Sequence, residues 1–116
     1  MTRFSDGPAA GHTLRLRRAP IYLRVTRDPA GGIDALDQAG DRPCPDEALF
    51  AYRQQSYDGS VHINSWDSQG RRTGGFFPMA TYALIDPQPD EATMRSLASW
   101  QEWTEADYDR RRAEAR

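Results

Sequence analysis

The sequence predicts an α+β domain, with a small antiparallel sheet or half-barrel of four to five strands covered by one C-terminal amphipathic helix. Two patterns predict the sheet, because apolar and polar residues alternate along short segments and turn-forming Gly, Pro and Asp residues separate those segments. An apolar repeat of helical spacing after residue 90 predicts the helix. The chain has 116 residues, the size of one ordinary domain. We assign residues 1–12 to a flexible N-terminal lead-in and residues 13–116 to the single domain.

The clearest strand pattern lies at residues 21–27, where large apolar residues alternate with polar ones. A weaker alternation at residues 13–18 is one step out of phase with it, so we expect a bulge at Pro20. Residues 28–32 have the composition of a tight turn. Residues 33–36 then form either a short second strand or a single helical turn.

Three further segments predict an antiparallel meander. Residues 49–57 and 61–66 alternate, and Asp58-Gly59 between them is the strongest hairpin signal in the chain. After a longer connection at residues 67–75, the most apolar stretch follows at residues 76–85. We expect that stretch to supply much of the core.

The helix is expected at about residues 90–103. Asp90 is a suitable N-cap, and the residues after it place large apolar side chains three positions apart. The tail at residues 104–116 is charged and rich in alanine, which indicates a frayed and solvated helix end. The apolar positions of the helix are Met94, Leu97, Trp100 and Trp103.

Composition excludes several classes of protein. No apolar run has the length of a membrane span and no signal-peptide core is present, so we expect a cytoplasmic protein. A single cysteine and two histidines provide neither an internal disulfide nor a zinc-ligand set. The motifs of nucleotide-loop enzymes, zincins and serine hydrolases are also missing. The sequence therefore predicts no metal, no cofactor and no enzymatic activity.

The basic residues are all arginine, and they are unevenly distributed. Residues 1–27 carry a net charge of +5 and residues 28–70 carry −6, while the whole chain has a net charge of −2. The lack of lysine is typical of proteins encoded by high-GC genomes, including the small accessory proteins of such bacteria and their phages. The two segments either pair across the sheet and cancel, or present surfaces of opposite charge to a partner.

The candidate binding residues are arginines and aromatic residues, which dominate the energetics of many interfaces. We expect a small non-enzymatic protein–protein interaction module, whose partner is another protein or a second copy in a homodimer. The alternative is a nucleic-acid-binding domain that uses an arginine-rich strand face, with a tyrosine available for base stacking. The candidate residues are Arg15, Arg17, Tyr22 and Arg24 in the N-terminal strands, Arg71 and Arg72 in a glycine-rich loop, and Trp103 on the helix.

One pair of residues raises the question of catalysis. A thiol nucleophile with an imidazole base would need Cys44 to lie beside His62, and nothing in the sequence brings them together. His62 alternates with apolar neighbours and shares its face with Asn64 and Trp66. That arrangement indicates a polar sheet face, so we rank an enzyme below both binding hypotheses.

Overall fold

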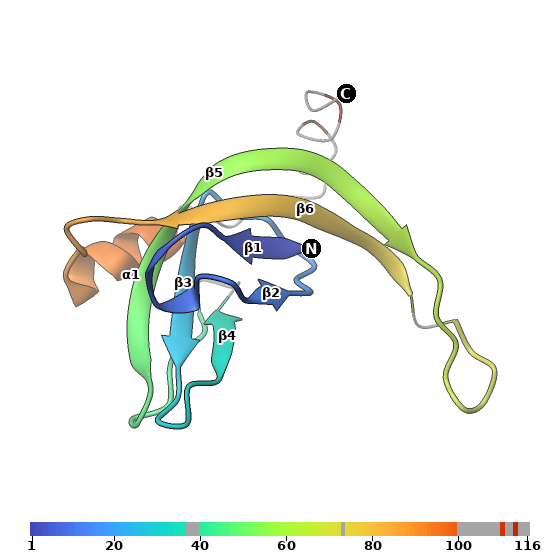
Figure 1. Cartoon of the computed structure of the whole chain (residues 1–116), viewed down its shortest axis with the longest axis horizontal. Helices are drawn as coiled ribbons and strands as arrows, with labels where there is room; N and C mark the ends of the chain where they lie inside the picture. The colour runs from blue at the N-terminus through green and yellow to red at the C-terminus, as the bar shows by residue number, and fades with distance from the viewer. Residues whose placement is uncertain (37–39, 73, 100–109, 111–112, 114–116) are drawn as a thin grey trace.

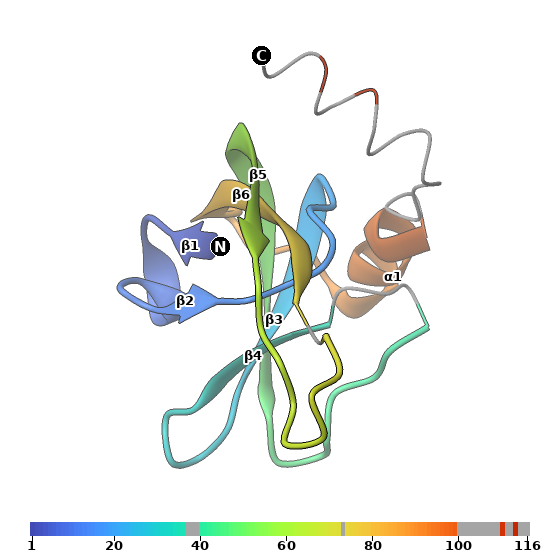
Figure 2. The ribbon, with the colours of Figure 1, turned by 90° about the vertical axis from the view of Figure 1, so that its right-hand side faces the viewer.

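Figure 1 shows the computed structural model of the chain, in which residues 1–36, 40–72, 74–99, 110 and 113 are described. They form a six-stranded mixed sheet that curves so strongly that it is nearly barrel-shaped, and helix α1 lies beside it (Figures 1 and 2). The predicted α+β class is confirmed, but the sheet is larger than the expected four to five strands. None of the helices formed by these residues is long and apolar enough to cross a membrane.

The order of the strands across the sheet is β2-β1-β6-β5-β3-β4. β1 runs parallel to β6, and every other neighbouring pair is antiparallel. The first strand of the chain therefore lies beside the last one. In chain order, the elements are β1 (Thr2–Phe4), the short 3-10 helix η1 (Gly7–Ala9), β2 (Thr13–Leu14), β3 (Tyr22–Arg27), β4 (Ile33–Leu36), β5 (Ala48–Ile63), β6 (Gly75–Leu84) and α1 (Glu91–Ser99).

The beginning of the chain differs from the expected lead-in over residues 1–12, because β1 and η1 form there. Thr2 and Phe4 are buried while Arg3 between them is exposed, which is the alternation of a half-buried strand. The ring of Phe4 meets the ring of Tyr52 edge-on, with centroids 5.0 Å apart. Three residues are too few to show a period in the sequence, so β1 is recognisable only from its partners.

The expected hairpin turn at Asp58-Gly59 is wrong. The chain continues through these residues as part of β5, and the register against β6 shifts between Tyr57 and Ser60. Gly59 has a φ of +88°, a conformation that glycine adopts at no steric cost in tight turns and in bulges alike. The two predicted strands are thus one long bulged strand, and the hairpin connects β5 to β6.

The core brings together buried residues of β1, η1, β3, β5 and β6 and is rich in aromatic residues, with Tyr52 and Tyr82 fully buried. Each buried tyrosine hydroxyl has hydrogen-bond partners. The Tyr82 hydroxyl donates to the Pro20 carbonyl at 2.6 Å. The Tyr52 hydroxyl accepts from the Ala9 N–H at 3.0 Å and donates to the Asp6 carbonyl at 2.9 Å. Because these hydrogen bonds satisfy both hydroxyls, a chain poor in aliphatic residues can bury tyrosine side chains in its core without leaving their polar atoms unpaired.

Helix α1 follows the predicted cap, because the Asp90 carboxylate accepts the Thr93 N–H at 2.8 Å. That hydrogen bond holds the pKa of Asp90 below its usual value. Met94 is buried, as its position in the apolar repeat predicts. Residues 100–103 of the predicted helix lie outside the described part of the chain, as does most of the tail at 104–116.

Candidate interaction surface

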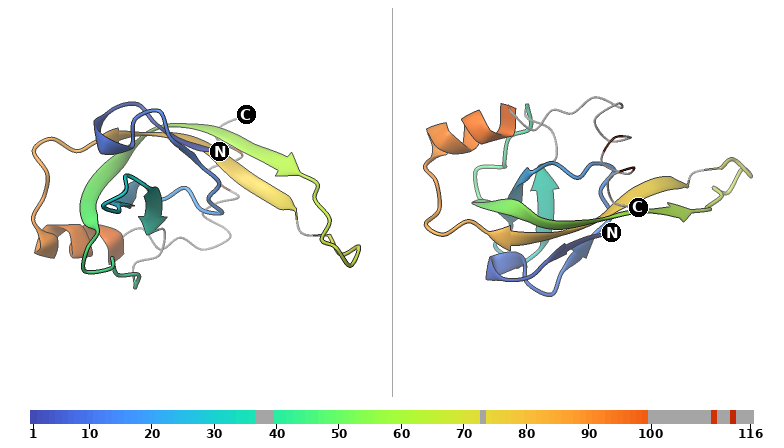
Figure 3. Two further views of the ribbon diagram at one scale, coloured as in Figure 1. Left: turned by 60° about the horizontal axis from the view of Figure 1, so that its bottom comes forward. Right: turned by 90° about the horizontal axis from the view of Figure 1, so that it is seen from above.

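The hairpin of β5 and β6 is much longer than the strands beside it. Pairing with β3 ends at Arg53, and pairing with β1 ends at Ala80, whereas the β5–β6 pairing continues to Ile63 and Gly75. The last part of the hairpin is therefore a two-stranded ribbon that projects from the sheet, at the end of the molecule opposite α1 (Figures 1 and 3). We call its end, residues 60–72 and 74–78, the arm.

Two large apolar side chains are exposed on the arm. Trp66 is 67% exposed and Phe76 is 59% exposed, although the sequence predicts Phe76 to lie in the core. The ribbon has no full second layer to cover its faces, so these two side chains stay in water, although Phe77 is covered by Arg15 and Arg17. The His62 ring stacks on Phe76, with centroids 4.6 Å apart and planes inclined by 30°.

The loop at the end of the arm is organised by one carboxylate. Oδ1 of Asp67 accepts the backbone N–H groups of Gln69 and Arg71, each at 2.9 Å, and Oδ2 accepts from the Arg71 Nε at 2.9 Å. The Arg71 N–H, followed by that of Gln69 and by the guanidinium, holds the pKa of Asp67 below its usual value. Gly70 completes the turn with a φ of +77°. Asp67 thereby fixes the position of Arg71.

A second set of contacts crosses the arm. The Arg72 guanidinium contacts Nε2 of His62 and donates to the Asn64 side-chain carbonyl at 3.1 Å. Residue 72 also forms an isolated antiparallel bridge with Trp66. Arg72 therefore connects the two sides of the hairpin at the level of the exposed aromatic rings.

Gly74 allows the two chains to approach closely at the base of the loop. A Cβ atom added there would lie only 1.8 Å from the Ile63 carbonyl oxygen, which no other residue type tolerates without movement of the backbone. In the sequence, the Gly74-Gly75 pair suits a flexible turn. In the structure, Gly74 has a steric role in the arm.

The predicted binding residues fall into separate places. Arg71 and Arg72 lie on the arm, as described. Arg15 and Arg17 both lie against the ring of Phe77 near the base of the arm, with their guanidinium carbons 5.6 and 4.9 Å from its centroid. Because side chains alternate along a strand, the ring of Phe77 lies on the face of β6 opposite to that of Phe76.

The other predicted binding residues do not join the arm. Arg24, expected on an outer face, is only 4% exposed and donates to the Asp41 carbonyl at 2.8 Å. Burial, followed by the nearby Arg42, lowers the pKa of Arg24. Tyr22 is partly covered by Arg53, whose guanidinium carbon lies 5.9 Å from the ring centroid. Trp103 lies outside the described residues.

The thiol and the imidazole are far apart. Cys44 precedes β5 and His62 lies near its far end, so the length of the strand separates them. A hydrogen bond to the Glu47 carboxylate, together with its charge, raises the pKa of the exposed Cys44 thiol. A raised pKa lowers the fraction of reactive thiolate. No group of three or more potential metal ligands occurs in the described part of the chain.

The structure exposes both Trp66 and Phe76, although the sequence pattern predicted neither as a binding residue and predicted Phe76 to lie in the core. The sequence pattern placed Trp66 on the same face as His62 and Asn64, which agrees with the contacts made through Arg72. The missing information was the length of the hairpin, because it determines which apolar side chains have no second layer above them.

Comparison with protein-family models, with curated proteins and with solved structures finds no significant match to this chain.

Proposed function

We propose that this protein is a non-enzymatic protein-interaction module and that the arm is its principal contact surface. The observation that carries the proposal is the exposure of Trp66 and Phe76 at the end of a projecting hairpin, beside Arg71 and Arg72. Tryptophan and arginine are enriched among residues that dominate binding energy. Exposed large apolar residues that lie close together are typical of interaction sites.

The contacts within the arm support this function because they reduce the cost of binding. Immobilising a flexible side chain at an interface costs about 0.5–1.5 kcal/mol. Arg71 is already held by Asp67, and Arg72 by His62 and Asn64. The arm therefore presents its polar groups in a defined geometry before a partner arrives.

The alternative, binding of single-stranded nucleic acid, has one observation in its favour. Exposed aromatic rings beside arginines are the elements of a base-stacking surface. Three observations favour a protein partner instead: both arm guanidinium groups are engaged within the arm, the Tyr22 ring is partly covered by Arg53, and the net charge of the chain is −2. Nucleic-acid-binding domains usually carry a clear basic excess.

Capture of the tagged protein's partners from a lysate of its own host, with and without nuclease, tests the proposal. Trp66→Ala is compared with wild type and with Ile21→Ala, since Ile21 is another exposed large apolar residue and lies away from the arm. We expect a stoichiometric protein that survives nuclease, is retained by Ile21→Ala and is lost by Trp66→Ala. Equal retention by both variants, or partners that disappear with nuclease, would contradict the proposal.

A further inference from the structure

Three exposed arginines gather where β1 and the chain after β2 meet β6. Arg3 lies on β1, while Arg15 and Arg17 follow β2 and lie against the ring of Phe77. Both guanidinium groups lie against the same ring, so Arg15 and Arg17 are close to each other. We call Arg3, Arg15 and Arg17 the basic cluster.

The basic cluster lacks acidic partners within the described part of the chain. Ion pairs there join Arg71 to Asp67 and Arg95 to Glu91, and neither pair includes a member of the cluster. The Phe77 ring offsets part of the repulsion between Arg15 and Arg17, because a cation is attracted to the face of an aromatic ring. No ion pair within the described residues includes the cluster, although Asp58 lies across the adjoining cavity from Arg3.

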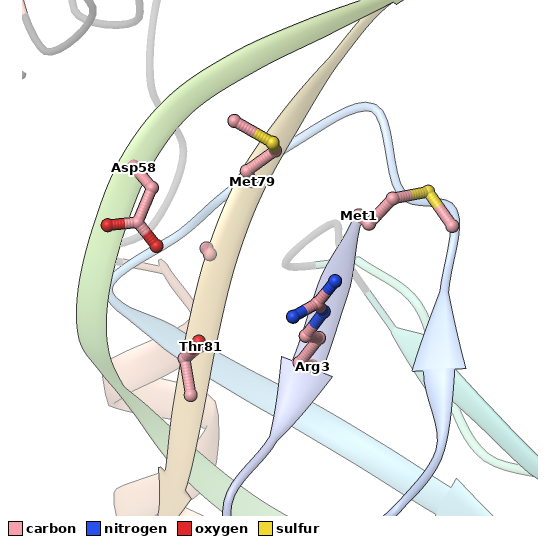
Figure 4. Close-up of a pocket in the computed structure, with 6 residues that line it drawn as sticks. Met1, Arg3, Asp58, Met79 and Thr81 are labelled. Atoms are coloured by element: carbon pink, nitrogen blue, oxygen red, sulfur yellow. The ribbon is translucent and has the colours of Figure 1, made fainter.

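A small cavity lies beside the cluster, between β1, β6 and the bulge of β5. Its volume is about 130 Å³, and Figure 4 shows Arg3 at one side of it and Asp58 at the other. It is a partly open depression with a lining that is half polar and half apolar, and it has space for a few atoms of a bound side chain. The full lining is Met1, Arg3, Asp58, Met79, Ala80 and Thr81.

The N-terminal ammonium group lies near two members of the cluster. The ammonium group of Met1 donates to the Pro78 carbonyl at 2.6 Å. Burial, followed by the charges of Arg3 and Arg15, lowers the pKa of this ammonium group. Two members of the cluster thus repel a third cation at the same edge of the sheet.

We propose that the basic cluster is a docking site for a carboxylate-rich segment of a protein partner. Guanidinium groups bind carboxylates through paired, charge-assisted hydrogen bonds, and Arg15 and Arg17 present two such groups on one aromatic base. Arg17 also reaches the base of the arm, where its Nη1 lies 3.2 Å from the position of a Cβ on Gly75. The inference rests on the proposed function, since it names the chemistry of a segment that lies beside the arm in the complex.

Carboxylates of a protein fit the cluster better than the phosphates of a nucleic acid. A nucleic acid carries a continuous row of charges and needs an extended basic track. The cluster is local, Asp58 lies on the same cavity, and the chain as a whole is negative. A short acidic segment places a few carboxylates on the arginines and leaves the rest of the surface free.

The test measures binding of a fluorescent deca-glutamate peptide by anisotropy at low salt, with a ten-nucleotide deoxythymidine strand as the second probe. The test variant is Arg15→Gln/Arg17→Gln. The control, Arg27→Gln/Arg95→Gln, removes the same charge at exposed positions outside the cluster. Arg3→Gln supplies a milder substitution if the test variant fails to fold, which circular dichroism reveals.

We expect the peptide to bind wild type, the test variant to lose about tenfold or more in affinity, and the control to lose about twofold or less. Trp66→Ala, which leaves the cluster intact, is expected to bind the peptide like wild type. Three results would each overturn the inference: no binding of the peptide, equal losses in the test and control variants, or tighter binding of the nucleotide strand. If the peptide fails to bind while capture still depends on Trp66, the docking site is refuted and the proposed function stands.

Discussion

The hydroxyl of Tyr52 connects the beginning of the chain to the core, and Tyr52→Phe removes that connection while leaving the ring in place. The hydroxyl accepts from the Ala9 N–H at 3.0 Å and donates to the Asp6 carbonyl at 2.9 Å. Ala9 is fully buried, so its N–H loses its only acceptor and has no access to water. Asp6 is exposed, so its carbonyl can bind water instead.

The expected loss follows from the buried N–H. Leaving a buried donor unsatisfied costs about 1–3 kcal/mol, and we take about 2 kcal/mol for Tyr52→Phe. Unfolding entropy of about 2.1 cal/mol/K per residue gives about 0.24 kcal/mol/K for a chain of 116 residues. The melting temperature should therefore fall by about 8 °C.

Thermal and urea unfolding, followed by circular dichroism, measure this loss. Tyr22→Phe is the matched control, because its hydroxyl makes no hydrogen bond within the described residues and its ring contact with Arg53 is kept. The control should shift the melting temperature by less than about 2 °C. Equal shifts in the two variants would refute the reasoning.

The pH dependence gives an independent check. Burial raises the pKa of Tyr52 above its ordinary value of 10.0. The folded chain then keeps the proton at a pH where the unfolded chain loses it, so this contribution to stability is complete below about pH 10 and declines as the pH rises further. Because Tyr52→Phe lacks the titrating group, the stability gap between wild type and the variant should narrow above that pH.

Three further predictions concern other parts of the molecule. Gly74→Ala should destabilise the end of the arm by more than about 1 kcal/mol, because the new Cβ meets the Ile63 carbonyl; faster chymotrypsin cleavage in the arm would show this, and an unchanged rate would contradict it. Cys44 should react with a thiol reagent more slowly in the folded than in the denatured chain, because Glu47 raises the pKa of its thiol; a faster folded-state reaction would count against this account. Gln88→Leu should lower the free energy of unfolding in urea by about 1–2 kcal/mol, because the Gln88 side chain accepts the Ala51 N–H at 2.7 Å and donates to the Ala51 carbonyl at 2.9 Å; a stability equal to wild type would argue that water replaces these hydrogen bonds.

The parts of the fold that the sequence predicted correctly depend on local patterns. The strand at 22–27 keeps one apolar face, and the start of the helix carries its own cap in Asp90. These features are visible because the residues that determine them are neighbours in the chain.

The parts that it missed depend on distant partners. β1 has three residues and is defined by β6. A positive φ at Gly59 serves a turn and a bulge equally well, so only the continued pairing with β6 distinguishes them. Local patterning also favoured an outer position for Arg24, although its neighbours in space bury it. In each case, tertiary packing decided between conformations that the local sequence permits equally.

The candidate site divides in the same way. Arg71 and Arg72 were recognisable from a glycine-rich connection between strands, which is where exposed functional residues concentrate. Phe76 was not recognised as a surface residue, because apolar residues at alternating positions normally indicate a buried face. Trp66 was placed on a polar sheet face but was not recognised as a binding residue. Both are exposed because β5 and β6 extend beyond the neighbouring strands β3 and β1.

The parallel pairing of β1 with β6 has a consequence for synthesis on the ribosome. Thr2 pairs with Ala80, so β1 cannot pair with β6 until most of the chain between them has been synthesised. Until then Phe4 has no complete core around it, although the β1–β2, β3–β4 and β3–β5 pairs can already assemble. A sheet closed by strands so distant in sequence forms slowly, and the side chain of Phe4 remains open to chaperones and proteases until β6 has emerged.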